Sequence, residues 1–79
     1  MLLMRLCTPP YDAGQLAAIE TARAMILSNQ LAVKSLEPVA VRDFGHCWAV
    51  IFEYLIPMDP SIVVVDVDKL TGRGEFFLD

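Results

Sequence analysis

The sequence is poor in basic residues, and this scarcity excludes the partners that need a positive surface. Its 79 residues contain six lysines and arginines against ten acidic residues, so the net charge is −4. Nucleic acids and anionic membranes are bound mainly through basic protein surfaces. We therefore expect neither of them as a main partner.

Long apolar runs are also missing. No run approaches the roughly 18–20 residues that a membrane-spanning helix needs. The apolar start, Met1 to Cys7, is short, has no basic region before it and is interrupted by Pro9 and Pro10. A secretory signal peptide has a longer apolar region and a basic start. The sequence therefore predicts a cytoplasmic protein.

Cysteine and histidine are too few for an obvious metal or nucleophilic site. Cys7 and Cys47 are the only cysteines, and in a cytoplasmic chain we expect two free thiols that pack as small apolar groups. His46 is the only histidine, and it precedes Cys47 directly. Neighbouring strand residues point to opposite faces, which argues against a catalytic pair. Glycine is scarce as well, and no glycine-rich phosphate loop is present.

What the sequence has in abundance is apolar side chains. They make up 56% of the residues, whereas charged residues make up 20%. This excludes an intrinsically disordered chain. The length leaves room for one small domain, residues 1–79, and for one layer of helix on sheet.

A helix is predicted from Ala13 to Ser28, within a helical region 12–29 that includes its caps. Asp12 and Gln15 have the spacing of a capping box. Apolar residues then recur at steps of three and four, which places them on one helical face. The members of this predicted stripe are Leu16, Ile19, Ala22, Met25 and Ile26.

Beyond residue 38 the apolar period changes from helical to alternating, which predicts strands. We expect strands near 39–42, 47–56, 62–68 and 73–78. In the second of them Trp48, Val50, Phe52 and Tyr54 share one face, which we expect to pack on the helix. The fold class is therefore α+β, with one N-terminal helix packed on a four-stranded antiparallel β-meander. Residues 1–10 are expected to be an extended segment and 38–79 to be the sheet.

Asp66 and Asp68 follow an apolar run, as the metal-binding carboxylates of a phosphotransferase do. Such sites take further ligands from later segments, but only eleven residues follow Asp68. An EF-hand loop fails too, because Leu70 stands where an oxygen ligand belongs. We expect a turn cap at Asp68, a solvated strand residue at Asp66, no metal, no cofactor and no enzymatic activity.

Charge is divided unevenly along the chain. Residues 1–34 contain three basic and two acidic residues, whereas 35–79 contain three basic and eight acidic residues. An acidic sheet surface keeps a protein soluble, and it is also suited to docking a basic partner. The residues predicted to bind such a partner are Asp43, Glu53, Asp59, Asp66, Asp68 and Glu75.

Apolar residues exceed what one helix can cover, because a single helix shields one face of a sheet. The remaining face is expected to meet a second copy of the chain or a partner. The predicted centre of a homodimer contact is Ile51, Val63 or Val65, and the alternative is cover by residues 1–8.

Two segments resemble a known group of proteins: the strand CWAVIFE at Cys47–Glu53 and the hairpin VDKLTG at Val67–Gly72. They are similar to small bacterial domains with a cystatin-like or NTF2-like curved sheet, among them immunity proteins of polymorphic-toxin systems. PepSY-like domains share the hairpin. The resemblance implies a non-enzymatic, protein-binding module that neutralises a toxin or an enzyme. The alternative hypothesis is a structural or assembly subunit that homodimerises through its sheet without a dedicated target.

Overall fold

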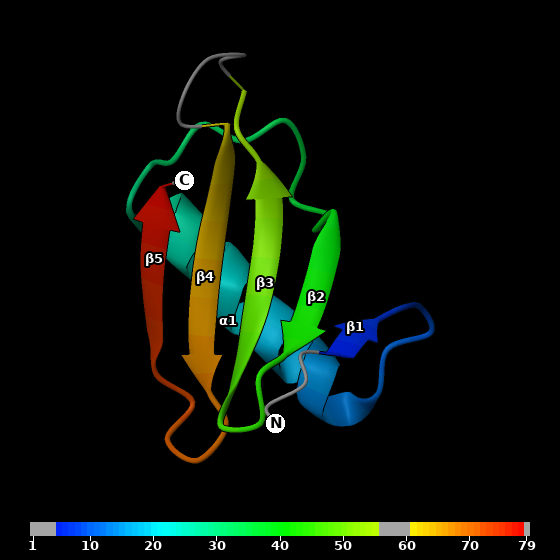
Figure 1. Cartoon of the computed structure of the whole chain (residues 1–79). Coiled ribbons are helices and arrows are strands. Elements are labelled where there is room, and N and C mark those ends of the chain that lie inside the picture. Colours follow the sequence, from blue (N-terminus) through cyan, green and yellow to red (C-terminus); the bar gives the residue numbers. More distant parts are fainter. Residues whose placement is uncertain (1–4, 56–60, 79) are drawn as a thin grey trace.

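The computed structural model describes residues 5–55 and 61–78, which form one helix packed on one face of an antiparallel sheet (Figure 1). The chain runs through β1 (Arg5–Cys7), α1 (Ala13–Ser28), β2 (Ala40–Asp43), β3 (Cys47–Glu53), β4 (Ile62–Asp68) and β5 (Gly74–Leu78). The spatial order of the strands follows their order in the chain. The predicted α+β fold, with an N-terminal helix on an antiparallel meander, is confirmed.

Helix α1 begins and ends as its sequence directs. The Asp12 carboxylate accepts a hydrogen bond from the Gln15 N–H, and the Gln15 side chain accepts one from the Asp12 N–H, so the capping box is formed. At the other end Gln30, rather than Asn29, takes the left-handed conformation, with φ of 55°. The Leu31 N–H then bonds the Ile26 carbonyl, which closes the helix by a Schellman motif.

The buried face of α1 consists of Ala18, Ile19, Ala22 and Ile26. Leu16, which we expected on this face, is 51% exposed. It lies six residues before Ala22, which at about 100° per residue puts it roughly 120° around the helix. The expectation for Leu16 was wrong. Although Leu16 is three residues before Ile19, it lies only at the edge of the buried helical face.

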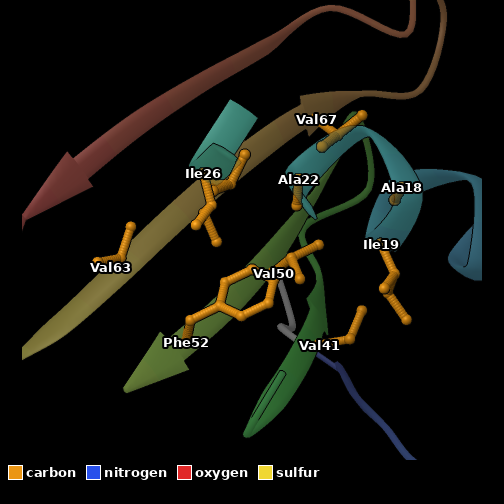
Figure 2. Close-up of a cluster of buried hydrophobic side chains, with 10 residues drawn as sticks. Ala18, Ile19, Ala22, Ile26, Val41, Val50, Phe52, Val63 and Val67 are labelled. Atoms are coloured by element: carbon orange, nitrogen blue, oxygen red, sulfur yellow. The ribbon is translucent and has the colours of Figure 1, made fainter. Parts of the chain in front are cut away.

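The face of the sheet toward α1 carries the core. Trp48, Val50 and Phe52 of β3, and Tyr54 just beyond its end, belong to it or pack against it, as predicted. Figure 2 shows Phe52 and Val50 lying between the helix and the strands on either side. The fully buried residues with the largest side chains are Phe52, Ile26, Val41, Val50, Val63 and Val65.

Strand β4 alternates strictly between its two faces. Val63, Val65 and Val67 are buried toward the helix, and Val64 and Asp66 lie on the outer face. This corrects two of the residues that we predicted for a homodimer contact. Val63 and Val65 are fully buried beneath α1, so a second copy approaching the outer face cannot reach them.

A short strand that we did not predict, β1, lies within the expected extended segment. It pairs with β2, with Cys7 opposite Val41, and so extends the sheet at that edge. Residues 1–8 were expected, as an alternative to a homodimer, to cover the outer face. Of these, residues 1–4 lie outside the described residues. Cys7 packs on the helix side, and Cys47 lies two strands away on the outer face. Neither of them is in a disulfide.

Gly74, at the start of β5, is a point of close approach between the sheet and the helix. A Cβ built on Gly74 would overlap the sulfur of Met25 and touch Thr21. The absence of a side chain therefore lets the hairpin end of β5 lie against α1. No helix in residues 5–55 and 61–78 is both long and apolar enough to cross a membrane.

Candidate functional site

The outer face of the sheet, which α1 does not cover, is hollowed by two adjoining depressions. One, of about 540 Å³, is polar and lies at the end of the sheet where the β4–β5 hairpin turns. The other, of about 400 Å³, runs across β2, β3 and β4 and has an apolar floor. His46, Cys47 and Asp66 line both depressions. We call the two together the outer groove.

Two carboxylates of the outer groove lie directly opposite each other. Asp66 of β4 is paired in register with Glu75 of β5. Among the described residues neither of them forms an ion pair or a hydrogen bond through its side chain. Burial and the neighbouring Glu75 charge raise the pKa of Asp66, and His46 acts weakly in the opposite direction. Like charges placed opposite each other destabilise a strand pair, so this position favours a cation that would neutralise it.

Asp68 caps the β4–β5 turn, as the sequence predicted. Its Oδ1 accepts hydrogen bonds from the N–H groups of Leu70, at 2.8 Å, and Thr71, at 2.9 Å. These bonds lower the pKa of Asp68. The carboxylate therefore holds the hairpin in shape while it also lines the polar depression. The prediction of a turn cap is confirmed.

Asp43 is at the same end of the sheet but is engaged elsewhere. Its Oδ1 accepts a hydrogen bond from the Lys69 ammonium at 2.6 Å and another from the Gly45 N–H. The same ammonium lies 4.0 Å from the centre of the Trp48 ring. Lys69 thus ties the β4–β5 loop to the β2–β3 loop, and Asp43 is committed to this internal link.

The remaining predicted acidic residues lie apart from the groove. Glu53 is at the opposite end of β3, where it forms an ion pair with Lys34 at 3.1 Å. Asp59 lies outside the described residues. The structure therefore brings Asp66, Asp68 and Glu75 together in the groove. Asp43 is near them but is tied to Lys69, and Glu53 lies at the other end of β3.

The apolar part of the outer face is narrower than the sequence indicated. Ala49 is buried and Ile51 is only 7% exposed, because both are flanked by residues of adjacent strands on the same face. The accessible apolar group is instead Phe77 of β5, which is 49% exposed. Phe77 lies opposite Val64, so an apolar strip continues from the groove to the edge of the sheet.

The groove includes basic residues that were not among our predicted site residues, namely Arg42, His46 and Arg73. Phe77, also not predicted, lies beside the groove at the edge of the sheet. The hairpin register was the available signal, because a turn centred near Leu70 pairs Asp66 with Glu75 and Val64 with Phe77. His46 and Cys47 both line the polar depression, although adjacent strand residues would point apart. His46 precedes the first residue of β3, so strict alternation does not apply to it.

The chemistry of Cys47 is that of a protonated thiol. Burial raises its pKa, and the nearby carboxylates of Asp66 and Asp68 raise it further. Reactive cysteines have a lowered pKa, so this environment opposes a nucleophilic role. Within the part of the chain that the structure describes, no three His, Cys, Asp or Glu residues are grouped to hold a metal ion.

Comparison with models of known families, with curated proteins and with solved structures found no match. The geometry of the outer groove is therefore the basis on which a function can be assigned.

We expect Asp66→Asn and Asp68→Asn to change the pH dependence of stability in opposite directions. A raised pKa means that stability from Asp66 is greatest below the unfolded value of about 3.9 and is lost as pH rises. Asp66→Asn should therefore gain stability over the wild type on going from pH 3 to pH 7, by up to about 1 kcal/mol for removal of an opposed like charge. The lowered pKa of Asp68 has the opposite sign, so Asp68→Asn should lose stability over the same range.

The measurement is urea unfolding of the wild type and both variants at several pH values between about 3 and 7. The isosteric substitutions keep the shape of each side chain, so the difference reports charge. Parallel pH profiles for the two variants would contradict the assigned environments.

Proposed function

We propose that the chain is a non-enzymatic protein-binding module of the immunity or inhibitor kind, which occludes a basic partner through its acidic outer sheet face. The observation that carries this proposal is the opposed pair Asp66 and Glu75, which forms no ion pair among the described residues. A partner's arginine or lysine placed between the two carboxylates would relieve their repulsion. The expected mechanism is electrostatic steering followed by anchoring on apolar surface.

Three further observations support the proposal. Asp68 adds a third carboxylate to the polar depression. Val64 and Phe77 supply an apolar strip beside the charges, as in interfaces whose apolar centre is bordered by polar residues. The raised pKa of Cys47 disfavours a thiol nucleophile. The sequence resemblance to immunity proteins implies the same class of function.

The test begins with a pull-down from the source organism, identification of the partner by mass spectrometry and purification of that partner. Its affinity and its activity are then measured with wild-type protein, Glu75→Lys and Glu20→Lys. Glu20 lies on the exposed side of α1, away from the sheet, so Glu20→Lys matches the change in charge without touching the groove. We expect Glu75→Lys to weaken binding by at least about tenfold, equivalent to 1.4 kcal/mol, and Glu20→Lys to leave it unchanged.

The proposal requires that the partner is basic and loses activity when bound. An acidic partner, or equal effects of the two variants, would contradict it.

The second candidate function is a structural subunit that homodimerises through its sheet. The exposed Phe77, next to an apolar floor, favours it. Because Ile51 is almost buried, Ile51→Lys would harm folding, and Phe77→Lys is the better variant. Sedimentation that shows a wild-type dimer and a folded Phe77→Lys monomer would favour this function, whereas a monomeric wild type would exclude it.

A further inference from the structure

The free edge of β5, beside the outer groove, has backbone hydrogen-bonding groups that are open. β5 forms the edge of the sheet opposite β1 (Figure 1). At the hairpin, the Asp68 N–H donates to the Arg73 carbonyl. In an antiparallel pair, hydrogen-bonded and non-hydrogen-bonded positions alternate. Glu75 and Phe77 therefore direct their backbone groups to β4, whereas Gly74, Phe76 and Leu78 direct theirs away from the sheet.

Independent hydrogen bonds support this assignment. On the other side of β4, the Lys69 N–H donates to the His46 carbonyl and the Tyr54 N–H donates to the Ser61 carbonyl. Because hydrogen-bonded positions alternate between these two ends, the backbone groups of Val63, Val65 and Val67 bond to β3. The backbone groups of Val64 and Asp66 are therefore directed to β5. The described residues make no hydrogen bond to the outer backbone groups of β5.

The same alternation decides which β5 side chains an added strand would meet. Toward such a strand, Glu75 and Phe77 occupy non-hydrogen-bonded positions, where the Cα atoms of opposite residues are only about 4.5 Å apart and side chains are closest. Both side chains are exposed on the outer face. An added strand would thus place one residue against the Glu75 carboxylate and another, two positions away, against the Phe77 ring.

Charge distinguishes a basic segment from a second copy as the occupant. If two copies of β5 paired antiparallel about Phe76, each Glu75 would lie diagonally from the other at about 7–8 Å. Pairing about Glu75 would place the two carboxylates directly opposite. Asp66 lies beside Glu75 in each copy and adds to the repulsion. A basic residue at the same place meets two carboxylates that are not paired within the described residues.

We propose that the free edge of β5 accepts an extended basic segment of the partner as an additional antiparallel strand, in the chain order apolar–x–basic. The apolar residue lies against Phe77, and the basic residue lies against Glu75, with Asp66 one strand further into the sheet. This inference rests on the proposed function and names the form of the partner. Backbone hydrogen bonds supply affinity in this mode, and the two side chains supply specificity.

The probe is a short, fluorescein-labelled peptide rich in Thr and Val, with phenylalanine–x–arginine at its centre, and the readout is fluorescence anisotropy. A control peptide has the same composition in the order arginine–x–phenylalanine. We expect saturable binding of the first peptide and binding at least about threefold weaker for the second, which forfeits an opposite-charge and an aromatic cross-strand pair. Equal binding of the two peptides, or no binding up to about 1 mM, would overturn the proposal.

The backbone contact is tested with Leu78→Pro and Leu78→Ala. Proline removes the outward N–H of Leu78 without removing a bond to β4, whereas alanine removes the side chain and keeps the N–H. We expect peptide binding to be lost in Leu78→Pro and to be retained in Leu78→Ala, with equal urea midpoints for the two variants. Retention of binding in Leu78→Pro would overturn the added strand.

The side-chain contact is tested by exchanging charges. Glu75→Lys should weaken binding of the arginine peptide by about tenfold, because an attraction becomes a repulsion at a position of close approach. A peptide with glutamate in place of arginine should restore the affinity for Glu75→Lys, and Glu20→Lys should behave as the wild type does. Failure of the rescue would overturn the register.

The two proposals can fail separately. If the purified partner is sensitive to Glu75→Lys but binds Leu78→Pro normally, the acidic face is the binding surface and the added strand is wrong. If the partner is insensitive to both variants, the proposed function fails as well.

Discussion

Replacing Phe52 by alanine should destabilise the protein by about 3–5 kcal/mol, the usual cost of removing a buried phenylalanine ring. Phe52 is fully buried and belongs to the same core cluster as Ile26, Val50 and Val63 (Figure 2). Because hydrogen bonds between the strands hold the surrounding backbone in place, it cannot fully close the space that the ring leaves. A small domain has a free energy of unfolding of roughly 5–15 kcal/mol, so this single change removes a large share of it.

The matched control is Phe77→Ala. Phe77 has the same side chain in the same sheet but lies on the outer face and is half-exposed. We expect a loss of no more than about 1 kcal/mol for this surface substitution. Urea unfolding of both variants gives the comparison. Similar losses for Phe52→Ala and Phe77→Ala would mean that α1 does not define the buried face of the sheet.

The sequence was sufficient for α1 and for β2 to β5 because their signals are local. The Asp12 and Gln15 capping box marks the start of α1, and the alternating residues of β3 identify both the strand and its helix-facing side. Asp68 was recognisable as a turn cap because the N–H groups that donate to its Oδ1 lie within three residues. Signals of this range need no knowledge of how distant segments pack.

The errors concern relations across the fold. The valine-rich run of β4 offers two chemically similar faces, so composition alone did not show that Val63 and Val65 face α1. Ile51 was expected to be exposed, but residues of neighbouring strands bury it. β1 has only three residues, which is too few for an alternating pattern, and its position depends on pairing with β2.

The candidate site shows the same limit in its charges. Asp43 and Glu53 are as acidic in the sequence as Asp66 and Glu75, yet each is paired with a lysine, Lys69 and Lys34 respectively. The residues of each ion pair are 26 and 19 positions apart, and nothing in the local sequence indicates them. Asp66 and Glu75 form no ion pair among the described residues, and the hairpin register places these two carboxylates opposite each other.

The contact between α1 and the sheet leads to the second large effect, which we expect for Ala22→Leu. Ala22 is fully buried, and with Ala18 it forms the part of the helix that lies on the strands (Figure 2). A leucine adds three carbons where the core has no space, so it must push the helix away or take a strained rotamer, at a cost of about 1–3 kcal/mol. Moving α1 would also disturb the approach of Met25 to Gly74.

Ala24→Leu provides the control for Ala22→Leu, because the same change is made two residues away on the exposed side of α1. Leucine is nearly as good a helix former as alanine, so Ala24→Leu should leave the urea midpoint almost unchanged. Ala22→Leu should lower the midpoint while the slope of the transition stays the same, since a change in stability without a change in compactness has that signature. Equal midpoints for the two variants would show that a gap separates the helix from the sheet at Ala22. That result would contradict close packing of α1 on the sheet, which is the reason that only the outer face is accessible.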